Sequence, residues 1–119
     1  MACEIIKKDG DILHARISGN MTLNDQQEIQ TASGNLIMEY GTTRLLLTLQ
    51  DFQGWEKGST WGDIGFMIGQ GEFIAKMAIV GDKRWEEDAL VFVGKGLRAT
   101  QIEFFSAASA KDAETWIRS

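Results

Sequence analysis

The 119-residue sequence predicts an α/β fold, organised as a single domain over residues 1–119. A two-residue turn signal near the start separates two strand-like runs, which predicts a β-hairpin. After it, apolar runs of strand length alternate with segments of helical spacing. We therefore expect the order β-β-α-β-α-β-α-β-α, because such alternation is typical of helices that cross between parallel strands. The expected sheet is five-stranded and mixed, antiparallel in its first hairpin and parallel afterwards, with four helices.

The predicted hairpin joins Cys3–Lys8 to Asp11–Ser18 through the turn signal Asp9-Gly10. The second segment alternates between two sets of side chains: Leu13, Ala15 and Ile17 on one face, and Ile12, His14 and Arg16 on the other. A period of two is that of a strand with one buried face. His14 has no second histidine or cysteine partner, so it is not a metal candidate, and we expect a solvated side chain.

The first helix is bounded by capping residues. Thr22 is the expected N-cap, and Asp25 stands three residues later, as in a capping box. Gly41 stands where a helix commonly ends in the left-handed conformation. The apolar residues in between fall near helical spacing: Leu23, Ile29, Ala32, Leu36, Ile37 and Tyr40.

The rest of the chain alternates between strands and helices. The expected strands are Thr43–Leu49, Ala75–Val80 and Thr100–Phe105. The first of these is a continuous apolar run, typical of a strand covered on both faces. The expected helices span about Thr60–Ile68, Arg84–Val93 and the segment that ends at Arg118. In the last helix, Ser109 and Asp112 form a capping signal. Its expected buried residues are Ala110, Ala113 and Ile117, with Trp116 beside them.

The charge balance argues against nucleic acid as a partner. The formal net charge is -5, the pI is about 4.8, and no block of Lys and Arg is longer than a pair. Binding to nucleic acid normally requires a basic face that neutralises phosphates. Attachment to an anionic membrane by charge alone is disfavoured for the same reason.

Composition and motifs argue against several further classes. One cysteine, Cys3, excludes an intramolecular disulfide and a cysteine-based metal site, and we expect it to be a poor nucleophile. The N-terminus lacks the apolar region of a secretory signal, and no run of about 18 apolar residues occurs, so we expect a cytoplasmic protein. The sequence contains no G-x-S-x-G elbow, no P-loop and no histidine-rich ligand spacing. We therefore expect no enzyme activity, no cofactor and no metal.

Two turns that carry tryptophan follow neighbouring strands. Asp51–Trp55 comes after the strand Thr43–Leu49, and Gly81–Trp85 comes after the next one. Ligands of wound α/β folds gather at the carboxyl ends of parallel strands, so the two turns are expected to line one pocket. The candidate ligand-binding residues of these turns and of the helix between them are Phe52, Trp55, Trp61, Ile64, Phe66, Met67, Ile68, Asp82 and Trp85.

The expected helix Thr60–Ile68 carries apolar residues on more than one face, and Asp63 is its only charge. A surface helix normally has a polar face. Glycines weaken this helix, each by about 1 kcal/mol in a helix interior. Such a helix can serve as a lid, or dock on a membrane or a partner. The alternative is that its aromatic residues are ordinary core, and for Asp82 the alternative is a turn residue that caps the next helix.

Four motifs in order resemble one family. They are "LLLTLQDFQGW" (Leu45–Trp55), "AIVGDKRW" (Ala78–Trp85), "IEFF" (Ile102–Phe105) and "DAETWI" (Asp112–Ile117). Together they are similar to the bacterial SpoIIAA-like family, whose fold is that of STAS domains. The resemblance covers nearly the whole chain. It implies a single α/β domain related in fold to lipid-carrying CRAL-TRIO domains, with membrane association and an apolar ligand as expected properties.

The better-known relatives of this family are anti-sigma-factor antagonists. The resemblance implies for them a switch by phosphorylation of serine in a "DSSG"-like loop after the strand that matches Thr43–Leu49. Here that region reads "QDFQGWEKGSTWGD", and Gly58 precedes Ser59 and Thr60. The serine-switch pattern is therefore not present, and phosphorylation control is not expected.

Two functions are left open by the sequence. The first is a non-enzymatic binding domain that holds an apolar, lipid-like molecule or a membrane surface through the helix Thr60–Ile68, which would place the protein peripherally at a membrane. The alternative is a STAS-type protein-interaction module that uses the same apolar helix as a homodimer or partner interface.

Overall fold

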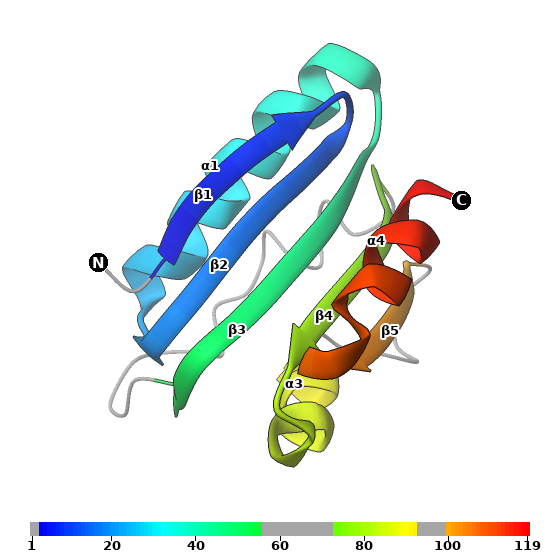
Figure 1. Ribbon diagram of the computed structural model, residues 1–119. Coiled ribbons are helices and arrows are strands. Elements are labelled where there is room, and N and C mark those ends of the chain that lie inside the picture. Colours follow the sequence, from blue (N-terminus) through cyan, green and yellow to red (C-terminus); the bar gives the residue numbers. More distant parts are fainter. Residues whose placement is uncertain (1–2, 56–72, 93–99) are drawn as a thin grey trace.

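The structure, a computed structural model, describes residues 3–55, 73–92 and 100–119. Its centre is a five-stranded sheet in the order β1-β2-β3-β4-β5 (Figure 1). The strands are β1 (Cys3–Asp9), β2 (Ile12–Met21), β3 (Thr43–Trp55), β4 (Ile74–Gly81) and β5 (Gln101–Ser106). β1 pairs with β2 antiparallel, and all later pairs are parallel. The predicted α/β fold with a mixed sheet is thus confirmed.

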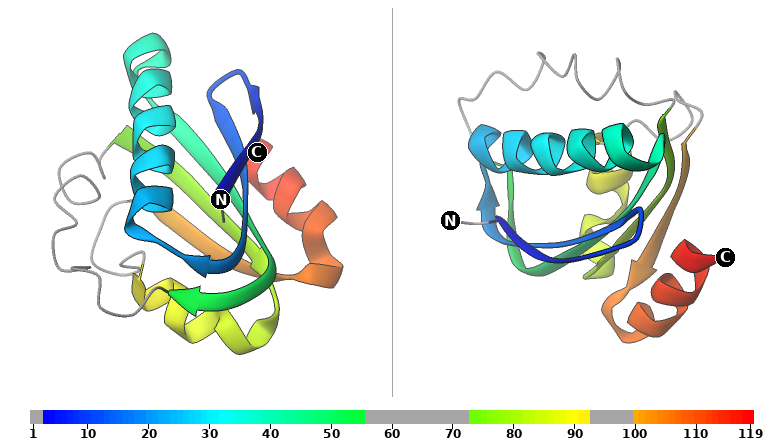
Figure 2. Two further views of the ribbon diagram at one scale, coloured as in Figure 1. Left: turned by 90° about the vertical axis from the view of Figure 1, so that its left-hand side faces the viewer. Right: turned by 90° about the horizontal axis from the view of Figure 1, so that it is seen from above.

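The described residues contain three α-helices: α1 (Leu23–Tyr40), α3 (Glu86–Phe92) and α4 (Ala110–Arg118). The fourth predicted helix, about Thr60–Ile68, lies outside the described residues. α1 and α3 cover one face of the sheet and α4 covers the other (Figure 2). None of the described helices is long and apolar enough to cross a membrane.

Both ends of α1 form as the sequence predicts. The Thr22 Oγ1 accepts a hydrogen bond from the Asp25 N–H at 3.1 Å, and the Asp25 carboxylate accepts from the Thr22 N–H at 2.8 Å. This reciprocal pair is a capping box. At the other end Gly41 is left-handed, with φ 82°, and its N–H donates to the Ile37 carbonyl at 2.7 Å. The left-handed conformation is why glycine stands there.

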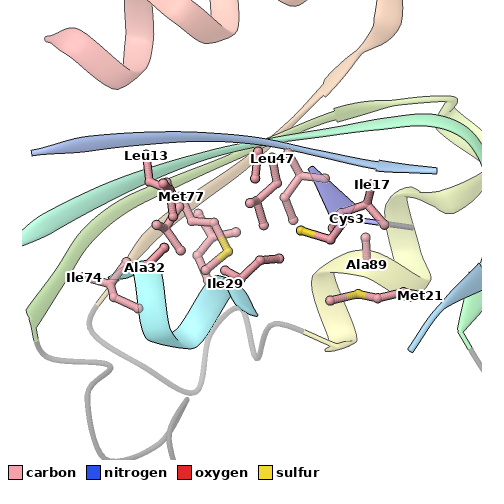
Figure 3. Close-up of a cluster of buried hydrophobic side chains, with 14 of the residues drawn as sticks. Cys3, Leu13, Ile17, Met21, Ile29, Ala32, Leu47, Ile74, Met77 and Ala89 are labelled. Carbon is pink, nitrogen blue, oxygen red and sulfur yellow. The ribbon is translucent and has the colours of Figure 1, made fainter. Parts of the chain in front are cut away.

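The larger core cluster lies between the sheet and the helices α1 and α3 (Figure 3). Leu13 and Ile17 of β2, Leu47 of β3, Ile29 of α1 and Ala89 of α3 belong to it. A smaller cluster lies under α4: Ile12, Leu46, Ala78, Val80, Ala113 and Ile117. Neighbouring residues of β3 therefore pack on opposite faces, as its apolar run predicts.

The predicted ends of two strands are wrong. β2 continues to Met21 and β3 to Trp55, because the two strands stay paired through register shifts near Gly19. Left-handed backbone at Gly19 (φ 64°), Asp51 (φ 52°) and Gly54 (φ 111°) accompanies these irregularities. Bulges of this kind let a pair continue past a break in its pattern. Residues 51–55, expected to be a turn, are therefore strand.

One helix start and one capping signal also differ from prediction. A 3-10 helix, Lys83–Trp85, precedes α3, which begins at Glu86 rather than Arg84. Another 3-10 helix, Ala107–Ser109, runs into α4, and Ser109 makes no side-chain capping hydrogen bond. Of the residues expected to be buried in α4, Ala113 and Ile117 are buried and Ala110 is exposed.

The prediction of a solvated His14 is wrong. His14 does lie on the face opposite Leu13, but the residue is only 8% exposed. Its neighbour Ile12 belongs to the cluster under α4. The second face of β2 is therefore also covered. The sequence did not indicate this, because His14 and Arg16 on that face are polar.

Candidate functional site

The candidate site is the edge of the sheet where β3, β4 and β5 end. The last residue pair between β3 and β4 is Thr48 with Val80, so the end of β3 extends beyond β4. β4 ends at Gly81, which packs closely on Leu49: a Cβ built on Gly81 would lie 2.9 Å from the Leu49 Cβ. Glycine is required there because real Cβ atoms essentially never come so close.

The first hollow at this edge has a volume of about 460 Å³. It lies between the ends of β3 and β4 and the start of α4. Its lining residues are Thr48, Leu49, Gln50, Asp51, Val80, Gly81, Asp82, Lys83, Ser106, Ala107 and Ala110. Leu49, Ala107 and Ala110 give it apolar surface, while Asp82 and Lys83 bring opposite charges to its border.

A second hollow of about 270 Å³ adjoins the first on the side of the 3-10 helix Lys83–Trp85. Its lining residues are Leu49, Asp51, Phe52, Gln53, Asp82, Arg84 and Trp85. Leu49, Asp51 and Asp82 line both hollows. These three residues therefore stand at the centre of the edge.

Asp82 caps the 3-10 helix that follows β4. Its carboxylate accepts a hydrogen bond from the Arg84 N–H at 3.0 Å, and its carbonyl accepts from the Trp85 N–H at 3.0 Å. The interpretation of Asp82 as a capping turn residue is confirmed. Asp82 is exposed and borders both hollows, so its capping hydrogen bonds fix the position of a negative charge at this edge.

Phe52 and Trp85 form an aromatic pair at this edge. Their ring centroids lie 5.0 Å apart and the rings meet edge to face at 79°. Phe52 belongs to the larger core cluster and Trp85 packs against it. The Arg84 guanidinium lies 4.9 Å from the Trp85 ring centroid, close enough for a cation–π contact. The pair thus fastens the end of β3 to the segment after β4.

Three of the nine predicted site residues, Phe52, Asp82 and Trp85, line the second hollow together. Trp55 ends β3 opposite Met21 of β2, and its side chain lies outside the described part of the structure. The other five also lie outside the described residues: Trp61, Ile64, Phe66, Met67 and Ile68.

Sequence reasoning missed Leu49 and Ser106 as lining residues, and it placed Asp51 in a lining turn without naming it as a site residue. Asp51 has a left-handed backbone, and the Gln53 side-chain amide donates to its carbonyl at 3.4 Å. Asp tolerates this conformation better than most residues, but the sequence carries no signal that it is adopted here. Ser106 reaches the edge only because β5 pairs with β4, a tertiary contact.

The described groups at this edge offer charge, hydrogen bonding and apolar contact. Across the described ranges, no group of three or more His, Cys, Asp and Glu side chains is placed to hold a metal ion. The Cys3 thiol lies away from the edge in the larger core, where burial, with Glu28 and Asp25, raises its pKa to about 11. A thiol with that pKa stays protonated at neutral pH and is a poor nucleophile.

A third hollow, of about 570 Å³, lies between β1 and α1 and contains none of the predicted site residues. Polar side chains of α1 form most of its lining: Asn24, Gln27, Glu28, Thr31 and Asn35. Ile5 and Lys8 of β1 complete it together with Ala32.

Comparison with solved structures identifies similar folds. An uncharacterised protein from Shewanella loihica PV-4 with a SpoIIAA-like fold matches with a TM-score of 0.71 at 20% identity, over 98% of this chain and 92% of that one. The unphosphorylated anti-sigma factor antagonist SpoIIAA matches at 0.61 and 9% identity, over 96% and 98%. The phosphorylated Bacillus cell fate determinant SpoIIAA matches at 0.56 and 13% identity, over 93% and 97%.

No curated protein matches the chain. The family model described as SpoIIAA-like matches residues 12–118, which is nearly the whole sequence. The match includes all of β2 to β5 and all three described α-helices. The chain therefore belongs to the SpoIIAA-like family.

Proposed function

We propose that this chain is a non-enzymatic protein-interaction module of STAS type, which binds a partner protein at the sheet edge where β3, β4 and β5 end. The observation that carries the proposal is the pair of adjoining hollows centred on Leu49, Asp51 and Asp82. Protein interfaces commonly combine an apolar centre with a polar, hydrated rim. Leu49, Ala107 and Ala110 supply the former, and Asp82 and Lys83 the latter.

Backbone strain at Asp51 supports the same edge. Asp51 is the one non-glycine residue with positive φ among the residues that the structure describes. Such strain persists where the surrounding structure enforces it, and it is concentrated at functional sites. Asp51 is exposed and borders both hollows, so its carboxylate is available to a partner.

Family membership supports partner binding over catalysis, since one solved neighbour is an anti-sigma factor antagonist. A phosphorylation switch is not part of the proposal. Gly58 precedes Ser59 in this sequence, in place of the aspartate of the "DSSG"-like loop.

Site-specific photo-crosslinking in cells tests the proposal. The photoreactive residue replaces Gln50 or Lys83, which border the first hollow, or Glu39, an exposed residue near the end of α1. We expect a discrete protein adduct from Gln50 and Lys83 and none from Glu39, and we expect Asp51→Lys to abolish it. Adducts of equal yield from all three positions, or none from the edge, would refute the proposal.

A second candidate is an apolar or lipid-like ligand in the first hollow. Its support is the volume of about 460 Å³, within the range of about 300–1,000 Å³ typical of ligand pockets, and the apolar lining by Leu49, Val80 and Ala110. Native mass spectrometry separates the candidates. A bound species above the bare chain mass, or co-sedimentation with liposomes, favours this second candidate; the bare chain mass with neither favours the first. Light scattering tests whether the partner protein of the first candidate is a second copy of this chain.

A further inference from the structure

His14 is a buried histidine with an unpaired ring nitrogen. The residue is 8% exposed, and the buried Nε2 atom has no hydrogen-bond partner among the residues that the structure describes. Buried polar atoms in proteins are normally hydrogen-bonded, so an exception calls for an explanation. It is also the one histidine of the whole sequence.

The position of His14 places it on the face that α4 covers. In β2 it alternates with Ile12, and in the sheet it stands beside Leu46 of β3. Both neighbours belong to the cluster that packs against Ala113 and Ile117 of α4. The environment of the ring therefore depends on α4 staying in place.

Four charged side chains from β1 and α4 lie near enough to the ring to act on its charge. Lys7 is its register partner on β1, and Asp9 lies two residues further on. From α4, the Arg118 guanidinium bonds to the Asp9 carboxylate at 2.6 Å and contacts Glu114 at 3.5 Å. These four groups comprise two cations and two anions, so their charges balance while His14 is neutral.

The nearby Arg44 of β3 is already engaged. Its guanidinium binds both oxygens of the Asp11 carboxylate, at 2.8 and 3.2 Å, and donates to the Ile117 carbonyl at 2.7 Å. Arg44 therefore offers no acceptor to a protonated ring, because a guanidinium only donates.

Burial lowers the pKa of His14 below its usual 6.5, and Lys7 and Arg118 lower it further, against the opposing effect of Glu114 and Asp9. Protonation of the His14 ring would add an unbalanced positive charge to a site that is largely shielded from water. Both ring nitrogens would then be donors, and Nε2 has no acceptor among the described residues. Each effect favours the neutral ring.

We propose that His14 is a pH-sensitive element of the contact between α4 and the sheet: the helix packs firmly while the ring is neutral and loosens when the ring binds a proton. The inference does not depend on partner binding at the sheet edge. It assigns a conformational role to a residue that lies outside the hollows described above.

The direction of the pH dependence follows from linkage. The folded-state pKa lies below the value of 6.5 expected for an exposed ring. The loosened state therefore binds protons more readily, and the contact weakens as pH falls through 6.5 towards the folded-state pKa. At pH 5.5 the population with α4 detached rises by at most about tenfold. Above pH 6.5 the contact is insensitive to His14.

NMR gives the first test, because one histidine yields one unambiguous ring signal. We expect the wild-type ring to titrate below 6.5. A midpoint at 6.5 or above would overturn the proposal. This measurement needs no variant, so a failure of any substitution to fold does not affect it.

Hydrogen exchange with mass spectrometry gives the second test. Protection of the α4 segment, residues 110–118, is compared with that of α1, residues 23–40, at pH 7.5 and 5.5 after correction for intrinsic exchange. In the wild type we expect α4 alone to lose protection, by up to about tenfold. His14→Leu, or His14→Gln, removes the titration and should remove the loss. An equal loss in a folded variant, or no selective loss in the wild type, would overturn the proposal.

Discussion

At the scale of single residues, Thr22 and Ser109 precede the helices α1 and α4, and only Thr22 caps its helix with a side-chain hydrogen bond. Thr22 and Asp25 form a complete capping box, and the Asp25 carboxylate also accepts from the Cys3 N–H at 3.2 Å, which ties β1 to the start of α1. Ser109 forms no such bond, because the preceding 3-10 helix leaves it at φ -106° and ψ 24°, outside the extended conformation of an N-cap. The pattern alone does not distinguish these cases.

Alanine at each position tests this difference. Thr22→Ala should lower the free energy of unfolding by about 1 kcal/mol, since it removes a cap that is formed. Ser109→Ala should change it by less than about 0.5 kcal/mol. Urea unfolding followed by circular dichroism measures both. Equal losses would contradict the capping described here.

Asp51 is held at a positive φ of 52°. Asp51→Gly should raise the free energy of unfolding by about 0.5–1 kcal/mol, because glycine adopts a positive φ without steric cost. Asp51→Ala should lower it, since alanine loses the polar side chain and keeps the strain. Thermal and urea unfolding of the pair measure the difference, and a destabilised Asp51→Gly would show that the residue is not strained.

Gly81 tests the packing at the same edge. It does not have positive φ, so alanine there is limited by space alone. Gly81→Ala should lower the free energy of unfolding by about 1–3 kcal/mol, because its Cβ would meet the Leu49 Cβ at 2.9 Å. Urea unfolding measures this loss. A change below about 0.5 kcal/mol would mean that β3 and β4 separate freely at this point.

At the scale of elements, two cationic side chains of the sheet hold the C-terminal end of α4 in place. Arg44 donates to the Ile117 carbonyl at 2.7 Å. Lys76 of β4 donates to the Trp116 carbonyl at 3.2 Å, and its ammonium lies 5.0 Å from the Trp116 ring centroid. These bonds satisfy carbonyls that the end of a helix leaves unpaired and complement its dipole.

Arg44 and Arg16 form a matched pair for mutation. Arg44→Met should lower the free energy of unfolding by about 1–3 kcal/mol and selectively increase hydrogen exchange in α4, because the Arg44–Asp11 pair is about four-fifths buried and also holds the helix end. Arg16→Met should cost less than about 1 kcal/mol, since the Arg16–Glu4 pair is exposed. Similar costs, or exchange that rises equally in α1, would argue against a specific role in holding α4.

The order and type of the described elements were predictable, but their ends were less so. The turn near Gly10, the caps of α1 and the apolar run of β3 are local signals, and each predicted its element correctly. The ends of β2 and β3 depend on bulges at Gly19 and Asp51, which arise from pairing between distant segments. A sequence pattern of period two does not contain that information.

At the scale of the whole molecule, the sequence pointed to this edge of the sheet but to only part of the lining of its hollows. The rule that parallel strands present ligands at their carboxyl ends led to Phe52, Asp82 and Trp85, and the structure brings these together. Leu49 and Ser106 were not identified from the sequence, because their place at the edge depends on how neighbouring strands pair. Phe52 and Trp85 also pack with the core, which aromatic content alone does not reveal.

The most direct test of the proposed function is the affinity of the partner identified by crosslinking for two charge-reversal variants. Asp51→Lys alters the edge where β3 to β5 end, and Glu28→Lys alters the hollow between β1 and α1. We expect Asp51→Lys to weaken binding at least about tenfold, or about 1.4 kcal/mol, and Glu28→Lys to leave it within about twofold. Equal weakening by both variants, or none by Asp51→Lys, would contradict binding at this edge.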